Sequence, residues 1–220
     1  MIDLLSRVEM YIRTGWLHAD PRVLKECQSL SKLVVRVLVS ATEGRTCLES
    51  GVLFGGVRYH TFPLVSRRLG RAGRFGWLKL LEFTVRVLAR VLRARSGVVW
   101  VHDLDVLLVP ALAGPRLRRR GIRLVWDQHE YPSNVMVSSR LFRACFRRSC
   151  GACSFVLHAN APRRDAVLRL LDGSLQCEHL VLENLPNQSF ADAAPGALPA
   201  PLESWLANRP FFLVVGGLSP

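Results

Sequence analysis

The residues best suited to acid–base chemistry stand together in one short stretch that follows an apolar run. Within four positions the chain places Asp127, His129 and Glu130. A carboxylate beside an imidazole can move a proton or contact a phosphate, because imidazole changes its charge near neutral pH. The apolar run Ile122–Trp126 predicts a strand that delivers all three side chains into one tight loop. The structural alternative is a loop whose carboxylates cap nearby backbone amides.

Polar residues also follow the other apolar runs of the chain. They are Ser40, His102, Asp103, His158, Asn160, Glu183 and Asn184. In an open parallel sheet, ligands bind beyond the carboxyl ends of the strands. We therefore expect a cleft along one edge of a sheet, lined by these residues together with Asp127.

The apolar runs themselves predict a sheet that is buried on both faces. They are short, nearly continuous and rich in β-branched residues, as in parallel sheets covered by helices. The strong strand candidates are Val34–Val39, Val98–Val101, Ile122–Trp126, Phe155–Leu157, Leu180–Leu182 and Phe211–Val215. Val8–Ile12 and Val57–Phe62 are weaker ones.

Amphipathic segments alternate with these strands. Asp20 followed by Pro21 predicts an N-cap and the first position of a helix, with Val23, Cys27 and Leu30 as its apolar stripe. Further helices are expected over Phe75–Arg95, Leu104–Arg120, Ser138–Cys150 and Pro162–Leu171, and Pro110 and Pro115 should kink the second of these or end it early. The alternation indicates an α/β fold, a Rossmann-like doubly wound parallel sheet.

The composition of the chain changes near residue 187. Residues 1–187 hold the strand–helix alternation, and residues 188–210 are dominated by Ala, Pro and Gly, as in a linker. Residues 211–220 then read as a buried strand running into glycines. We interpret this last segment as the first strand of a second Rossmann-like domain that the chain does not contain.

The charge balance favours anionic partners. The formal net charge is +13 over 220 residues, and nearly all of the cations are arginines. Nucleic acid, phosphorylated sugars and an anionic membrane surface all fit, and a simply solvated basic surface is the alternative. The chain has neither a signal peptide nor an unbroken apolar span, so a cytoplasmic protein with reduced cysteines is expected.

Two kinds of metal site are alternative interpretations of other residues in the chain. Asp103 and Asp105 spell an Asp-x-Asp motif, which would hold a divalent metal, although oxygen-ligand metals need more carboxylates than this. Cys145, Cys150, Cys153 and Cys177 mimic an iron–sulfur spacing, but Cys145 lies on the apolar face of a predicted helix.

The arginines of the predicted helices suggest a non-enzymatic module that binds anions. Arg140, Arg143 and Arg147 line one helix face, and Arg116, Arg118, Arg119, Arg120 and Arg123 form a dense run. Aromatic residues that would stack on bases are scarce among them, so no nucleic-acid partner is expected and peripheral contact with an anionic membrane fits better. No dinucleotide-binding glycine fingerprint follows a strand.

The order of these motifs resembles the family 4 glycosyltransferases of the GT-B fold, in their amino-terminal domain. That domain commonly has an Asp-Pro-Arg-Val stretch followed by Lys-Glu and Ser-Leu, a His-Asp strand end, an Asp-x-His-Glu after the next strand, a closing Asn-x-Pro-Asn, and then a hydrophobic strand into glycine. The matching segments are Asp20–Glu26, Ser29-Leu30, His102-Asp103, Asp127–Glu130, Asn184–Asn187 and Val214–Gly216.

The resemblance implies transfer of a sugar from a nucleotide-sugar to a sugar, glycan or lipid-linked acceptor, with no metal and no cofactor. It implies catalytic roles for His129 facing the reacting sugar, for Glu130 beside it and for Asp103 on the acceptor side. Substrate contacts would come from Gly15 near the donor phosphates and from His102, Asp127, Asn160 and Asn184. The carboxy-terminal donor-site motifs have no counterpart, so this chain alone is expected to be inactive.

Overall fold

The computed structural model describes residues 7–14, 17–33, 37–42, 49–66, 76–95, 97–171 and 177–183. All of them lie within one compact unit, Met1–Asn184. The predicted linker at 188–210 and the predicted strand at 211–220 lie outside the described residues, as do Gly15 and Asn184.

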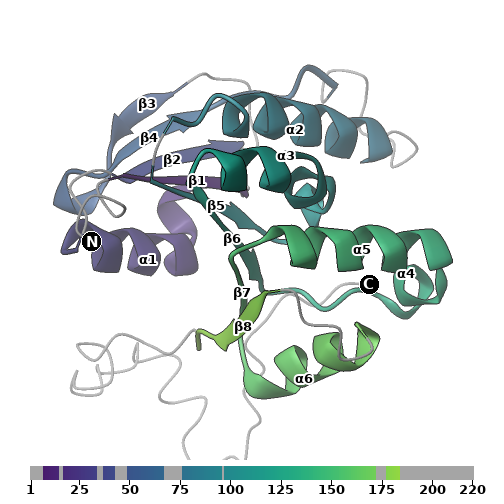
Figure 1. Cartoon of the computed structure of the whole chain (residues 1–220). Coiled ribbons are helices and arrows are strands. Elements are labelled where there is room, and N and C mark those ends of the chain that lie inside the picture. The colour runs from purple at the N-terminus through teal and green to yellow at the C-terminus, as the bar shows by residue number, and fades with distance from the viewer. Residues whose placement is uncertain are drawn as a thin grey trace, which may run out of the picture. The chain divides into compact units, whose positions relative to one another are not determined.

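The described residues form one sheet in the order β3-β4-β2-β1-β5-β6-β7-β8 (Figure 1). Every neighbouring pair is parallel except β3 and β4. The strands are β1 Val8–Arg13, β2 Val37–Thr42, β3 Ser50–Val52, β4 Arg58–Thr61, β5 Val98–His102, β6 Arg123–Gln128, β7 Phe155–His158 and β8 Glu178–Val181. The predicted α/β fold with a doubly wound parallel sheet is confirmed.

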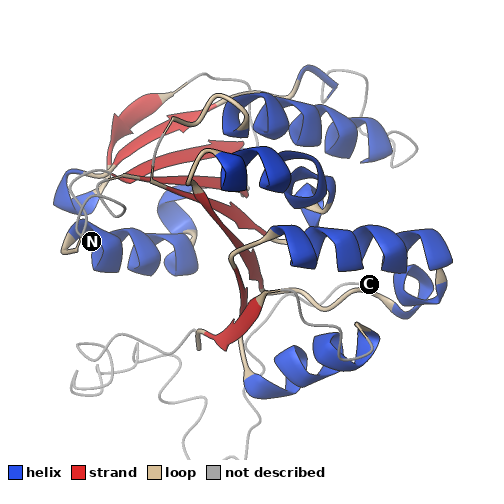
Figure 2. Ribbon diagram, in the orientation of Figure 1, coloured by secondary structure: helices blue, strands red, loops and turns tan. Residues whose placement is uncertain are grey.

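Helices cover both faces of the sheet (Figure 2). The α-helices are α1 Pro21–Ser31, α2 Gly76–Val91, α3 Leu108–Arg119, α4 Asn134–Ser138, α5 Arg140–Ala152 and α6 Ala161–Leu170, and the short 3-10 turns are η2 Leu17–Ala19, η3 Phe54–Gly56 and η6 Leu104–Val106. Helix α1 packs on one face through Val23 and Cys27. Helices α2, α3 and α5 pack on the other, around Phe83, Leu117 and Phe146. None of the described helices is long and apolar enough to cross a membrane.

The central strand, β1, is the one whose sequence signal was weak. Its polar residue Glu9 is buried, and it accepts a hydrogen bond from the hydroxyl of Tyr11 at 2.7 Å and pairs with Arg7 at 2.7 Å. A buried carboxylate is tolerated when such partners compensate its lost hydration. The polar residues of β1 are therefore explained by this network of hydrogen bonds and ion pairs, and they do not place β1 at the edge of the sheet.

The helix predicted over Leu104–Arg120 forms as two elements. The turn η6 comes first and α3 begins only at Leu108, so Pro110 falls in the first turn, where its missing N–H is not needed. Pro115 lies inside α3, which continues to Arg119. Of the two predicted effects, kinking the helix or ending it early, Pro115 does not have the second, because buried side chains on both sides of it hold α3 against α5.

Candidate active site

The site lies where the strand order reverses. From β1 the chain first builds outward through β2 and β4, and it then returns to the other side of β1 to add β5, β6, β7 and β8. Open α/β sheets bind their ligands at the carboxyl ends of the strands at such a point. Here β1 ends at Arg13, β5 is followed by Asp103, and β6 contains Asp127 near its end.

Asp103 has a backbone conformation that few residues other than glycine adopt. Its φ is 62° and its ψ is 179°. Its N–H donates to the carbonyl of Asp127 at 2.8 Å, and its own carbonyl accepts from Nε1 of Trp126 at 2.9 Å. Strain of this kind persists only where the surroundings fix it, and it gathers at functional sites.

The side chain of Asp103 is held by an arginine from α1. Arg22 donates to it twice, from Nη1 to Oδ1 at 3.2 Å and from Nη2 to Oδ2 at 3.0 Å. Burial alone would lower the pKa of Arg22, but the hydrogen bonds and charge of Asp103 outweigh it and raise that pKa. The fork of two bonds fixes the orientation of the carboxylate at the edge of the sheet.

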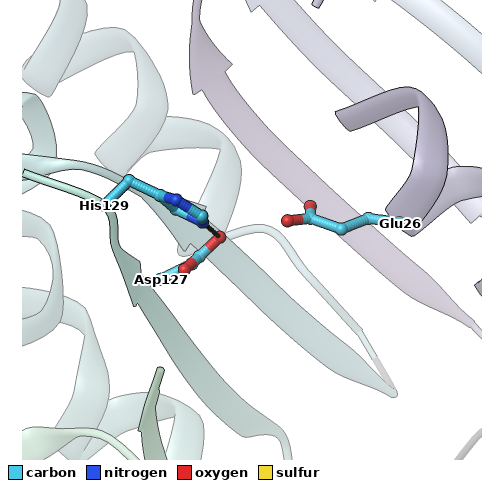
Figure 3. Close-up of side chains that lie close together, drawn as sticks. All are labelled: Glu26, Asp127 and His129. Atoms are coloured by element: carbon cyan, nitrogen blue, oxygen red, sulfur yellow. Dashed lines mark hydrogen bonds and ion pairs between the residues drawn. The ribbon is translucent and has the colours of Figure 1, made fainter. Parts of the chain in front are cut away.

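Two imidazoles converge on the fully buried carboxylate of Asp127 (Figure 3 shows His129 and Glu26 beside it). Oδ2 of Asp127 lies 3.1 Å from Nε2 of His129 and 3.2 Å from Nδ1 of His102. Burial raises the pKa of Asp127, but the close contacts and charge of the two histidines prevail and hold it below its ordinary value. Asp127 therefore stays ionised and orients the ring of His129 by a hydrogen bond, whereas Nδ1 of His102 lies close to it without hydrogen-bond geometry.

Glu26 of α1 is the second carboxyl group of this cluster. Its Oε2 lies 3.6 Å from Nε2 of His102, too far for a hydrogen bond, and it has no hydrogen-bond partner in the described part of the chain. Burial, and then the charge of Asp127, raise the pKa of Glu26 well above its ordinary value. Of the two carboxyl groups, Glu26 is thus the one that binds a proton more readily, as expected when two carboxyl groups share one site.

Metal ligands are available at one place among the described residues. Ligand atoms of Glu26, Asp127 and His129 all lie within 4.8 Å of one another. The Asp-x-Asp motif is arranged differently, because Asp103 pairs with Arg22 and Asp105 pairs with Arg13.

The cysteines of the iron–sulfur alternative do not gather into a ligand group in the described ranges. Cys150 and Cys153 are buried in the core, where burial raises the pKa of both thiols. Cys145 is only partly buried and lies on the side of α5 that faces an apolar groove. Cys150 and Cys153 are therefore core residues, whereas Cys145, on which the interpretation as core filling is based, is not fully buried.

Four of the predicted site residues come together, namely His102, Asp103, Asp127 and His129. Glu130 is exposed in the following bend, and its charge acts on Asp105. Asn160 is the N-cap of α6, where its Oδ1 accepts from the N–H of Arg163 at 2.9 Å.

The sequence did not identify Arg22 and Glu26 as site residues. Both come from α1, four positions apart, so they lie on the same face of the helix. The sequence did show a pair of polar residues at this spacing in the helix that follows the N-cap Asp20. The spacing alone does not predict which strands that face of the helix contacts.

No family model matches the chain, and no curated protein matches it either. Solved structures do. A structure described as trehalose-6-phosphate from E. coli bound with UDP-2-fluoro glucose gives a TM-score of 0.66 at 16% identity, over 92% of this chain and 54% of that one. The Anabaena Alr3699/HepE structure in complex with UDP and glucose gives 0.57 at 14% identity, over 92% of this chain and 50% of that one.

A third similar structure is a UDP-forming trehalose-phosphate synthase from Burkholderia xenovorans, with a TM-score of 0.53 at 13% identity, over 81% of this chain and 48% of that one. The chain thus spans about half the length of these solved structures. At such low identity the likeness concerns the fold. The fold of the chain is therefore the Rossmann-like fold of the GT-B glycosyltransferases.

Proposed function

We propose that the chain is the acceptor-side domain of a family 4-like glycosyltransferase. It would transfer a sugar from a nucleotide-sugar to a sugar, glycan or lipid-linked acceptor, in glycoconjugate or polysaccharide biosynthesis. The observation that carries the proposal is the strained Asp103, fixed by Arg22 and by β6 at the switch point of a GT-B-like sheet. Two of the similar structures are described with UDP and a glucose or fluoroglucose group bound, which supports a nucleotide-sugar donor.

The geometry suggests a division of roles. His129 is the partly exposed member of the buried cluster, so we assign it to face the reacting sugar, with Asp127 orienting its ring. The acceptor hydroxyl must lose a proton as the new glycosidic bond forms, and the oriented carboxylate of Asp103 is our candidate to accept it. Glu130, which is exposed beside this cluster, would influence the site through its negative charge. His102 supports Asp127 from behind, and Asn160 would contact substrate in addition to capping α6.

We propose that transfer needs neither a metal ion nor a cofactor, the nucleotide-sugar being a substrate. The support is that both carboxylates of the Asp-x-Asp motif are committed to arginines, Asp103 to Arg22 and Asp105 to Arg13. The diphosphate would then be neutralised by backbone amides and cationic side chains, with Gly15 allowing close approach, as the resemblance implies. Removing divalent metals with EDTA should leave the transfer rate unchanged.

The nucleotide itself would be held by a second domain. The chain covers only 54% of the E. coli structure, and the predicted strand at 211–220 would open the remaining part. Sequencing the transcript beyond the codon for Pro220 tests this. A frame that continues for about 150 residues with strand–helix alternation supports the proposal. A stop codon directly after Pro220 makes the chain a remnant or a partner-dependent module.

His129→Ala in the product of the longest reading frame tests the central role. Release of nucleoside diphosphate from a panel of nucleotide-sugars should fall about 100-fold or more, as when a group that positions the reacting centre is lost. His60→Ala is the matched control, because His60 lies on β4 and hydrogen-bonds Ser50, away from the cluster. Unchanged transfer by His129→Ala would remove His129 from the mechanism, and no turnover of any donor by the parent protein would remove the transferase itself.

A non-catalytic module that binds anions or a membrane surface is the second candidate. It is favoured by the net charge of +13 and by the exposed arginines of α5, including Arg140, Arg143 and Arg148. Binding of anions through these side chains would not require a catalytic site.

A further inference from the structure

An apolar groove lies among the helices that cover the face of the sheet opposite α1. Its volume is about 420 Å³, within the range of small-molecule sites. Trp77 and Leu81 of α2, Leu104 of η6, Leu108 of α3, and Phe142 and Cys145 of α5 line it. Asp105 is the one charged residue in the lining.

The side chains around the groove are more exposed than a folded core requires. Trp77 is 61% exposed, Leu81 49% and Leu141 74%. Helix α2 packs on the sheet through one set of apolar residues, such as Phe83 and Val87. It carries further apolar residues that line the groove, such as Trp77 and Leu81. A contiguous apolar surface of this kind on a basic, arginine-rich domain indicates that something apolar covers it in use.

The groove opens at the same edge of the sheet as the candidate active site. The helices that line it contribute residues from their amino-terminal turns, and these turns lie at the carboxyl ends of parallel strands. Asp105, at the polar end of the groove, forms an ion pair with Arg13 at the end of β1. Asp105 is two positions from Asp103, the proposed acceptor-side carboxylate. The charge of Asp103 acts on Asp105, so the part of the groove that Asp105 lines lies near the candidate site.

We propose that the groove holds the hydrocarbon chain of a lipid-linked sugar acceptor, with its sugar head group at the Arg13–Asp105 pair and beside Asp103. This inference rests on the proposed function. Of the acceptors named there, it selects the amphiphilic, lipid-linked one. The lining accepts methylene groups and offers almost no hydrogen bonds to a polar ligand, whereas its open end offers a guanidinium and carboxylates to sugar hydroxyls. A wholly hydrophilic glycan would leave the apolar walls uncovered.

Cys145 allows the occupant to be located. The test uses the 220-residue chain with octyl glucoside below its micellar concentration, and methyl glucoside as the short-chain control. Alkylation of Cys145 by N-ethylmaleimide is followed by peptide mass spectrometry, with Cys177, at the start of β8, as the internal reference. We expect octyl glucoside to protect Cys145 saturably and to leave Cys177 unchanged. Affinity should rise about fourfold for each added methylene until the groove is filled.

Two matched substitutions complete the test. Leu81→Asp places a charge in the groove and should weaken protection at least tenfold. Leu112→Asp changes a residue of α3 that is 57% exposed and does not line the groove, and it should have no effect. Leu141→Ala is a second substitution in the lining of the groove. Because the side chain of Leu141 is 74% exposed, this substitution should leave the free energy of unfolding nearly unchanged. Circular dichroism verifies that all three remain folded.

Several outcomes would overturn the inference. Equal protection by methyl and octyl glucosides, equal loss in Leu81→Asp and Leu112→Asp, or protection only above the micellar concentration would each do so. Resistance of Cys145 to alkylation without any amphiphile would mean that another part of the protein or a second copy covers the groove. If the product of the longest reading frame transfers to water-soluble acceptors while the 220-residue chain shows no chain-length dependence of protection, this inference fails and the proposed function stands.

Discussion

The chemistry of the candidate site depends on how two aspartates of neighbouring strands are held. Asp103 is fixed by two hydrogen bonds from Arg22, and Asp127 by a hydrogen bond with His129 and the nearby ring of His102. The backbone of Asp103 is in turn bonded to the carbonyl of Asp127 and to the indole of Trp126. Because the two segments are hydrogen-bonded to each other, a substitution at one aspartate should also shift the position of the other.

The backbone strain at Asp103 predicts an unusual order of stabilities for two variants. Asp103→Gly and Asp103→Ala both remove the carboxylate, but only glycine relieves the φ of 62°. We expect the glycine variant to unfold in urea with about 1 kcal/mol more stability than the alanine variant. Asp165 inside α6 is the control, because glycine there should be about 1 kcal/mol less stable than alanine. The same order at both positions would contradict the strain argument.

Glu26 predicts a pH dependence of stability. Its pKa is raised in the folded protein, so its stabilising contribution is complete below the ordinary pKa of glutamate and is lost as the pH rises through the folded value. Glu26→Gln stays neutral at every pH. The unfolding free energy of this variant, relative to the parent in urea titrations, should therefore increase as the pH rises from the ordinary pKa of glutamate through the raised pKa of folded Glu26.

Glu82 of α2 supplies the opposite control. Although burial acts to raise its pKa, hydrogen bonds from Ser66 and Val65 and the charge of Arg86 lower it. Its contribution is therefore present above the ordinary glutamate pKa and lost as the pH falls. Glu82→Gln should lose stability relative to the parent as the pH rises. Parallel profiles for Glu26→Gln and Glu82→Gln would refute the raised pKa of Glu26.

Four site residues could be predicted from the sequence because strand ends are local features. His102, Asp103, Asp127 and His129 each follow or end an apolar run, and parallel strands must bring such ends to one edge. Arg22 and Glu26 could not be predicted in the same way. They meet Asp103 and Asp127 across about 80 and 100 positions of chain, and nothing in the helix pattern of α1 states which strands it will cover.

Among the elements, β1 and α3 depart most from their sequence signals. The buried network of Glu9 with Tyr11 and Arg7 explains why a polar-looking segment is the central strand. Helix α3 tolerates Pro115 because it is held by close packing on α5, where Gly114 lies against Ala152. In both cases a tertiary interaction overrides a local preference, and such interactions are invisible in a single sequence.

The close approach of α3 and α5 predicts the effect of a single methyl group. A Cβ at position 114 would lie 2.6 Å from the carbonyl oxygen of Ala152 and 2.7 Å from its Cβ. We expect Gly114→Ala to lower the unfolding free energy by about 1–3 kcal/mol, since overpacking forces the backbones apart. Gly76→Ala at the start of α2 meets no atom within 4 Å and should be neutral or slightly stabilising in the same urea titration. Equal stability of the two variants would contradict this packing.

At the scale of the whole molecule, the two proposed surfaces are physically distinct. The groove is apolar, and it is the surface that we propose for the acceptor, whereas the described part of the chain also carries exposed arginines, among them Arg140 and Arg143 of α5. A net charge of +13 acts without a specific ligand geometry, so we expect it to attract the protein to anionic surfaces whether or not the groove is occupied.

Binding to vesicles separates this effect from the groove. The chain should co-sediment with vesicles that contain phosphatidylserine and should be released as salt shortens the range of the charges, while neutral phosphatidylcholine vesicles bind little. Arg140→Glu with Arg143→Glu on the exposed face of α5 should weaken this binding, because each cation near the surface contributes about 1 kcal/mol. Leu81→Asp should keep most of the salt-dependent binding. Equal binding to neutral and anionic vesicles, independent of salt, would show instead that apolar insertion governs the membrane contact and that the arginines only solvate the surface.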